Sequence, residues 1–277
     1  MKVNSREYQC RLNPALFERE ELQIKKFFTS LSKCTPNVKI IDKSIKRVNF
    51  HRFFYDTETD NFADTNIKLR VRVYDNFISF TYKVIAADRY YVQQVPIDCS
   101  DTKAKTKLEE GIYAHHSMFS KQTTSRQNKQ TNLTTIEEWC ELFQGATNIS
   151  PRQKAVLIAS PISFITKLAD ISLNFNGEEI KASLELRYVD AEKTALDKVE
   201  FSWKHRNNNE NYNSHTVILM RQFFQTINKS EWVDASIHFS KCQLDAGFTP
   251  LEHRFNNRSN NDKWSHKKGS CLLTKIC

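Results

Sequence analysis

The chain has 277 residues, of which 39% are apolar and 12% aromatic, and 41 Lys and Arg against 32 Asp and Glu give a net charge of +9. This apolar content can fill a core and excludes a wholly disordered chain, and the absence of a run of about 18 apolar residues excludes a predicted transmembrane segment. No apolar secretion signal opens the sequence, so we expect a cytoplasmic protein, and its basic excess favours a polyanionic partner.

The first 55 residues predict a strand, a helix and a second strand. Residues 7–12 have strand character, and Asn13 and Pro14 mark the start of a helix that should run to about Ser32. The apolar residues of this helix recur at helical spacing, which is typical of a helix that covers a core. Residues 48–55 follow as a strand.

The next segment predicts a hairpin with one basic face. Residues 67–74 alternate strictly between apolar and basic side chains. A two-residue turn at residues 75–76 would set the register, and it would place three polar pairs on one face: Arg72 with Ser79, Arg70 with Thr81 and Lys68 with Lys83. Because like charges in contact are destabilising, this face indicates either a bound anion or a fully solvated surface.

The remaining segments continue the alternation. We expect a strand over 89–97, followed by a mobile polar insertion or lid over 100–153 that contains a helix near 136–143. Residues 162–175 and 180–189 should then form a hairpin around an Asn-Gly turn, and residues 198–204 a further strand. A helix over 216–227 and a segment over 235–239 follow. One strand face of the late hairpin and of the strand after it is polar or charged: Lys181, Ser183, Glu185, Arg187, Lys198, Glu200, Ser202 and Lys204.

Many alternating strands with few helices predict an α+β fold built on a closed antiparallel β-barrel of about eight strands, with flanking helices and a polar interior. We expect a single domain over residues 1–252, interrupted by the insertion at 100–153. Residues 253–277 are basic and polar, and we expect this tail to be disordered.

Five short motifs occur in order along residues 5–245: Phe-Tyr-Asp-Thr at 54–57, Lys-Leu-Arg-Val-Arg-Val-Tyr at 68–74, Thr-Tyr-Lys at 81–83, Val-Glu-Phe at 199–201 and Phe-Ser-Lys at 239–241. Together they resemble the triphosphate tunnel metalloenzyme superfamily, which includes CYTH domains, RNA 5′-triphosphatases and the VTC-type polyphosphate polymerase domain. The resemblance implies a tunnel of eight strands in which Arg and Lys bind phosphates and carboxylates hold a divalent metal.

The chain departs from the CYTH pattern at acidic positions. That pattern opens with two Glu and a Lys at alternating positions, where this chain has Glu7, Gln9 and Arg11, and Ser202 stands in place of a second late Glu. The VTC-type pattern resembles the chain more closely because it has a single late Glu. It differs in having an Arg where this chain has Lys167 and a Lys where Ser202 stands.

The resemblance and the charged faces together predict a phosphate site. Its phosphate-binding residues are predicted to be Arg11, Arg70, Arg72, Lys83, Arg89, Lys167, Ser240 and Lys241, and its catalytic residues Glu200, Lys83 and Lys241. Arg70 and Arg72 are the strongest candidates, because guanidinium binds oxyanions in a bidentate manner. Mn²⁺ or Mg²⁺ prefers oxygen ligands, which points to Glu200 first and to Glu7 and Glu185 as further metal ligands.

Three functions remain open on the sequence. The first is metal-dependent phosphoryl transfer on ATP or polyphosphate, as in VTC-type polymerases or CYTH-type triphosphatases. The second is an RNA 5′-triphosphatase, and the third is a catalytically silent binder of nucleotide or polyphosphate. The predicted partner is accordingly a nucleoside triphosphate, inorganic polyphosphate or an RNA 5′ end. Gln9 and Ser202 are the substitutions expected where a metal site has decayed.

Overall fold

A computed structural model describes residues 2–34, 38–41, 45–57, 62, 65–144, 157–206 and 214–233. The elements are β1 (Ser5–Leu12), η1 (Pro14–Phe17), α1 (Glu20–Cys34), β2 (Val38–Ile41), β3 (Lys46–Asp56), β4 (Ile67–Val73), β5 (Ile78–Ala86), α3 (Arg89–Gln94), β6 (Lys105–Ile112), β7 (Ser117–Gln127), α4 (Ile136–Leu142), β8 (Ile158–Ala159), β9 (Ser163–Phe175), β10 (Glu178–Tyr188), β11 (Leu196–Arg206) and α5 (His215–Asn228). Within these residues, no helix is both long and apolar enough to cross a membrane.

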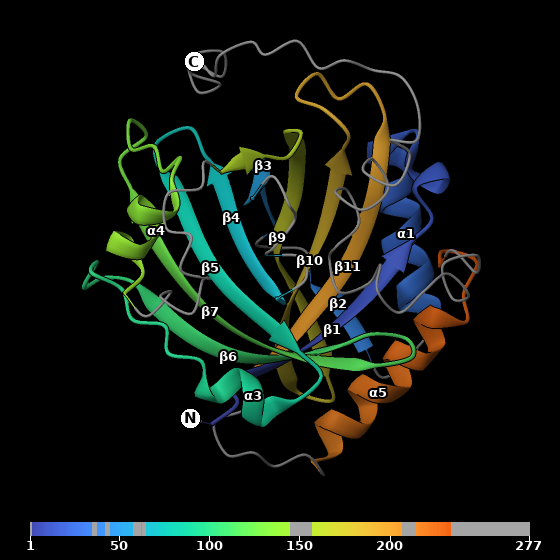
Figure 1. Ribbon diagram of the computed structural model, residues 1–277. Coiled ribbons are helices and arrows are strands. Elements are labelled where there is room, and N and C mark those ends of the chain that lie inside the picture. The colour runs from blue at the N-terminus through green and yellow to red at the C-terminus, as the bar shows by residue number, and fades with distance from the viewer. Residues whose placement is uncertain are drawn as a thin grey trace, which may run out of the picture.

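Nine of the described strands form a closed ring (Figure 1). The order is β1–β6–β7–β5–β4–β3–β9–β10–β11, and β11 pairs again with β1. The pairing of β3 with β9 joins the two halves of the ring. The predicted α+β fold with a closed ring of strands is thus confirmed, with nine strands in place of about eight.

The ring is antiparallel except at one pair. Strand β1 runs parallel to β6, with Ser5 opposite Glu109 and Glu7 opposite Gly111. Strands β6 and β7 come from the segment that was predicted to be a polar insertion or lid. That prediction was wrong for residues 105–127, because they form part of the wall, whereas residues 145–156 and the predicted tail lie outside the described residues.

The strand predicted at residues 89–97 is also wrong. Residues 89–94 form helix α3, whose N-cap Asp88 accepts hydrogen bonds from the backbone N–H groups of Tyr90 and Tyr91. A side-chain acceptor at this position satisfies donors that lack a partner in the first helical turn, so it favours a helix over a strand. At the other end of α3, Lys121 donates to the carbonyl oxygens of residues 93 and 95.

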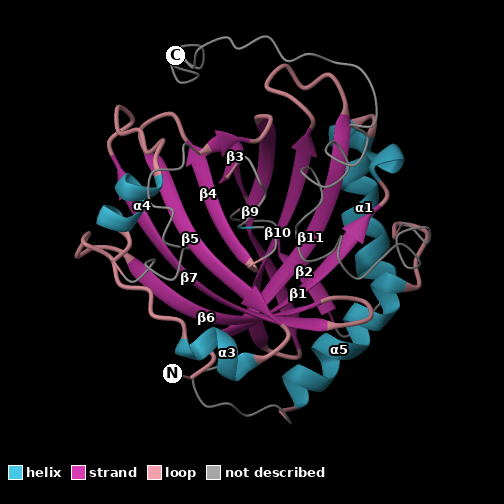
Figure 2. Ribbon diagram, viewed as in Figure 1, coloured by secondary structure: helices cyan, strands magenta, loops and turns pink. Residues whose placement is uncertain are grey.

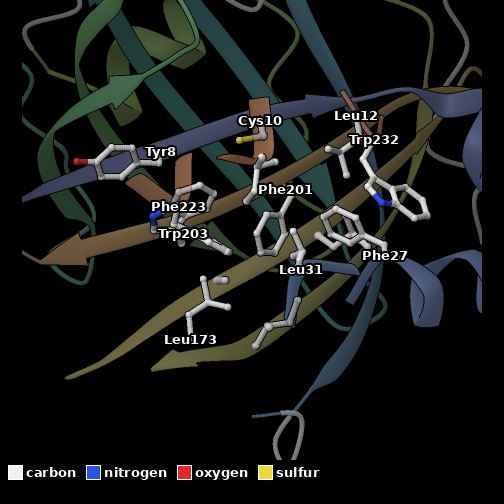
Figure 3. Packing of buried hydrophobic residues seen from close by; sticks show 14 of the residues in the cluster. Tyr8, Cys10, Leu12, Phe27, Leu31, Leu173, Phe201, Trp203, Phe223 and Trp232 are labelled. Atoms are coloured by element: carbon white, nitrogen blue, oxygen red, sulfur yellow. The ribbon is translucent and has the colours of Figure 1, made fainter. Parts of the chain in front are cut away.

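The apolar core lies outside the ring rather than inside it. Helices α1 and α5 cover the outer faces of β1, β9, β10 and β11, and Figure 3 shows the aromatic packing between them. Tyr8 stacks on Trp203 with ring centroids 5.5 Å apart, and Phe27 meets Phe201 edge to face at 5.3 Å. Strands that bury their apolar residues outward are left with polar residues facing inward.

A second apolar cluster covers the other side of the ring, where α4 packs on β3, β4 and β5 (Figure 2). Thr135 and Glu138 form a capping box that starts this helix. Fully buried Trp139 then contacts Tyr55 and Phe80. The apolar faces predicted to point outward are therefore covered by helices on both sides.

Two local features set the geometry of the late hairpin. Asn176 and Gly177 both have positive φ, which matches a two-residue hairpin turn and confirms the predicted Asn-Gly turn. Asp170 has φ of 60°, next to a shift of register between β9 and β10. This irregularity leaves Lys167 on the inner face while Ile171 joins the outer core.

Candidate functional site

The inner face of the ring collects the basic residues of β4 and β5. The register between these strands pairs Arg72 with Ser79, Arg70 with Thr81 and Lys68 with Lys83, as the sequence predicted. The intervening residues Leu69, Val71, Phe80 and Tyr82 are buried in the outer core. Strand alternation therefore directs these cations inward, to the face opposite the outer core.

A cavity of about 140 Å³ lies inside the ring. It is lined by residues of seven ring strands, together with Tyr113 of the β6–β7 turn: Glu7, Gln9, Phe54, Lys68, Arg70, Lys83, Ile85, Glu109, Gly111, Tyr113, Met118, Ser120 and Lys198. Of the residues predicted from the sequence, the cavity thus brings together Arg70, Lys83 and Glu7.

The three cations Lys68, Arg70 and Lys83 form one cluster in this cavity. Burial, and then Lys83 and Lys198, hold the pKa of Lys68 well below its ordinary value. Burial and the neighbouring Arg72 likewise depress the pKa of Arg70. Each positive charge is therefore both partly desolvated and repelled by its neighbours.

Arg70 and Lys83 have few partners for their hydrogen-bond donors and charges among the described residues. Arg70 donates one hydrogen bond to Thr81 Oγ1 at 3.3 Å, and its buried Nε has no hydrogen-bond partner among the described residues. Across the same described ranges, neither Arg70 nor Lys83 forms an ion pair. An anion about 4 Å from one such cation gains about 4 kcal/mol at an effective dielectric constant of about 20, before desolvation. The charge of this cluster is therefore suited to an anion.

The predicted residues Glu185, Arg72 and Lys167 come together in a second cluster, but as an internal ion-pair group. Arg52 donates to Glu185 at 2.6 Å, and the side chains are only 12% and 17% exposed. Burial alone would raise the pKa of Glu185, yet Arg52, Lys167 and Arg72 outweigh it and hold that pKa well below its ordinary value. Arg72 also lies over the ring of Phe50 at 5.3 Å, so its charge is already stabilised.

Glu109, which was not predicted as a site residue, carries the third cluster. It is 5% exposed and accepts hydrogen bonds from Ser5 and Gln122 at 3.0 and 2.8 Å. Lys204 lies 2.8 Å from Glu109 and 3.5 Å from Glu7, so one ammonium joins two carboxylates. Lys105, Lys107 and Glu109 alternate like other inward residues, and this signal could have identified β6.

The predicted metal ligands do not assemble into a metal centre. Among the described residues, no group of three or more His, Cys, Asp or Glu side chains is placed to hold a metal ion. Glu185 and Glu200 are opposite one another in the register of β10 and β11, but Glu200 pairs with Lys198 at 2.8 Å and Glu185 with Arg52. Carboxylates that are each neutralised by their own cation do not fit a divalent ion held by the protein.

Glu7 lies away from that carboxylate pair. On β1 it is Arg11 that is opposite Glu200, while Glu7 is opposite Lys204. Four strand residues separate Glu7 from Arg11, which is about 13 Å along the strand. The predicted set of Glu200, Glu7 and Glu185 is therefore spread over two regions of the lumen.

The other predicted site residues have different outcomes. Arg11 lies beside Glu200 on the neighbouring strand. Arg89 begins α3 and is not among the described residues that line the cavity, and its phosphate contact stays a prediction. Ser240 and Lys241 lie outside the described residues.

Comparison with known proteins gives similarity in structure only. No family model and no curated protein matches the sequence. A proposed adenylyl cyclase from Hippeastrum, described as having a dominant triphosphatase activity, is 11% identical with a TM-score of 0.46 over 83% of this chain and 90% of that one. A proposed adenylate cyclase from Bacillus halodurans is 11% identical with a TM-score of 0.41 over 86% and 100%, and a protein of Pyrococcus horikoshii is 12% identical with a TM-score of 0.34 over 80% and 89%. Likeness at this level carries no argument about activity, so a function has to rest on this chain's own residues.

Lys83 should make anion binding depend on pH. Burial and the nearby Arg70 lower the pKa of Lys83 to about 8. A bound anion favours the charged ammonium, so anion affinity should fall as pH rises through this value, by up to about tenfold per pH unit. Calorimetric titrations across this range should show the loss, and Lys83→Met should bind more weakly with a flatter profile. Equal slopes for the two proteins would place the titrating group elsewhere.

Proposed function

We propose that the lumen of this ring binds the phosphate chain of a nucleoside triphosphate or of inorganic polyphosphate. The proposal rests on the cluster of Lys68, Arg70 and Lys83, whose side chains line one cavity. Burial and repulsion by neighbouring cations lower the pKa of each of the three groups. Grouped cations of this kind lower the stability of the protein alone, and a polyanion offsets that cost. A phosphate chain is the ligand whose several closely spaced charges match several closely spaced cations.

The finer question is whether the bound phosphate chain reacts. Metal-dependent phosphoryl transfer with Glu200 and Lys83 in catalytic roles was predicted from the resemblance. Polyphosphate polymerase and triphosphatase activities differ in the acceptor of the phosphoryl group, which is a phosphate chain in the first and water in the second. The ion pairs of Glu200 with Lys198 and of Glu185 with Arg52 support the third candidate, a catalytically silent binder. We therefore propose binding as the function and treat turnover as a separate outcome.

Two measurements on the same protein test this proposal. Calorimetry with tripolyphosphate and with ATP in a chelator should detect binding that weakens as salt is raised, because the contacts are charge pairs. Incubation with ATP and Mn²⁺, followed by separation of the products, should show no phosphate release and no polyphosphate. The absence of binding to both ligands would remove the proposal.

Turnover in the second measurement would instead support the enzymatic alternatives. In that case Glu200→Gln tests the role predicted for Glu200, because a neutral amide is a poor ligand for Mn²⁺. Loss of turnover with retained binding would assign the metal to Glu200. A 5′-triphosphorylated RNA as substrate separates the RNA alternative from the nucleotide one.

A further inference from the structure

The cavity has two ends of unlike chemistry. Lys68 and Arg70 lie at one end, on β4. At the other end, on β1 and β6, Glu7 and Glu109 share the ammonium of Lys204, so these three side chains carry one net negative charge. Both carboxylates also attract the ammonium of Lys83, which lies between the two ends. A phosphate chain is attracted by the first end and repelled by the second. Inorganic polyphosphate, which is charged along its whole length, therefore matches only part of the cavity.

The acidic end is also the apolar end. The cavity is lined there by Tyr113, Met118 and Ile85, whereas Phe54 lies opposite Arg70 at the cationic end. The ring of Tyr113 stacks on His116 with centroids 4.8 Å apart and planes 17° apart, and the backbone N–H of Tyr113 donates to the His116 carbonyl oxygen at 2.9 Å. The β6–β7 turn thus holds an aromatic ring in a fixed orientation at the cavity.

Gly111 is required for this position of Tyr113. A Cβ atom on Gly111 would lie 3.1 Å from Tyr113 Oη and 3.2 Å from Tyr113 Cε2, closer than ordinary contacts allow, and 3.4 Å from Gln9 Nε2. The bare backbone of β6 therefore lets both a tyrosine ring and an amide approach. In Figure 1 the β6–β7 hairpin reaches across the lower part of the ring toward β1, with which β6 pairs.

We propose that the cavity selects nucleoside triphosphates over inorganic polyphosphate, with the triphosphate on Lys68, Arg70 and Lys83 and the base against Tyr113. This proposal rests on the proposed function and names its substrate class. Aromatic rings stack on bases of any identity. Carboxylates and an amide accept hydrogen bonds from ribose hydroxyls and base amino groups, whereas the ionised phosphates of polyphosphate have no hydrogen-bond donors to offer them. Along β7, Thr124 and Met118 are six residues apart, so the two ends are separated by about 20 Å.

Calorimetry with ATP and tripolyphosphate on the full chain tests the proposal through the ratio of the two affinities. We expect ATP to bind about 5- to 100-fold more tightly than tripolyphosphate, the range for one base stacked on one aromatic ring. Tyr113→Ala should remove most of this preference, Tyr113→Phe should keep it, and Gly111→Ala should reduce it by displacing the ring. Tyr90→Ala, at a ring 73% exposed on α3, is the matched control and should leave the ratio unchanged.

The outcomes separate the two proposals. Equal binding of ATP and tripolyphosphate, or an unchanged ratio in Tyr113→Ala, overturns the selection of nucleotides and leaves phosphate binding intact. A loss of affinity in Tyr113→Ala that is the same for both ligands also overturns it, because Tyr113 would then act only on the shape of the cavity. If neither ligand binds the original protein, the proposed function fails and this inference fails with it.

Discussion

Replacing Arg70 with methionine is expected to weaken tripolyphosphate binding by about 30- to 1000-fold and, at the same time, to raise the melting temperature. The binding loss corresponds to about 2–4 kcal/mol, the usual cost of removing a desolvated cation from an ion pair. The gain in stability has the opposite sign because Arg70 is partly desolvated, is repelled by Arg72 and Arg52, and leaves its buried Nε without a hydrogen-bond partner among the described residues. Methionine has a similar length and no charge to desolvate.

Calorimetry and thermal unfolding of the same samples measure both effects. Each kcal/mol of added stability should raise the melting temperature by about 2–4 °C in a chain of this size. Arg126→Met is the matched control, because Arg126 is an exposed arginine on β7 and lies over the ring of Phe77 at 5.1 Å. We expect its affinity to stay close to the original. A strong loss of stability in Arg70→Met would show that Arg70 serves the fold, and the proposed anion site would then be wrong.

Replacing Glu185 with glutamine should destabilise the protein by about 3–5 kcal/mol at neutral pH. The change removes the one carboxylate that Arg52, Lys167 and Arg72 share, and buried cations left without a counter-ion cost about this much. The folded-state pKa of Glu185 lies below its ordinary value of 4.5. Its contribution is therefore complete above that value and declines as pH falls below it.

Denaturant unfolding at neutral and acidic pH measures this difference in stability. The gap between the original protein and Glu185→Gln should shrink as the pH falls below 4.5. Glu179→Gln on the same strand is the control: Glu179 is 49% exposed and pairs with Lys181 at the surface, so its loss should leave stability nearly unchanged. A gap that stayed constant down to low pH would show that the charge of Glu185 is not what stabilises the fold.

Much of the fold could be predicted because short turns set the register of the two strands that they join. The two-residue turn before Phe77 determines every pair between β4 and β5, and the Asn-Gly turn at residues 176–177 does the same for β9 and β10 as far as the register shift near Asp170. In both hairpins, one apolar face makes the register unambiguous, since a shift by one residue would expose it. Local chemistry was sufficient for these strands.

Strand β7 of the former insertion was missed because both of its faces are polar. On β7, Thr123 and Ser125 are fully buried on the side away from the cavity, so the usual alternation of apolar and polar residues is absent. Residues 89–97 were misassigned for the opposite reason. Tyr90, Tyr91 and Val92 have strand propensity, yet the side chain of Asp88 starts a helix and leaves both tyrosine rings exposed.

The candidate site was predicted in part. Arg70 and Lys83 were found because they lie within one hairpin, whereas the partners of Glu185 and Glu7 depend on which strands become neighbours around the ring. Neither Arg52 beside Glu185 nor Glu109 beside Lys204 can be derived from sequence spacing, since 133 and 95 residues separate them. Ion pairs across a closed ring join residues that are far apart in the sequence, so local sequence patterns do not predict them.

The neighbours of β1 have a consequence for the order of folding. Its two edges pair with β6 and with β11, so Ser5 meets residues 109 and 206. During synthesis, the first strand of the chain has no complete set of partners until the last strand of the ring has been made. Strand pairs so distant in sequence close slowly, because the entropy of a long loop is lost before their contacts form. The first strand, with its apolar outer face, is thus the segment that waits longest with a free edge, and it is where a chaperone would be needed most.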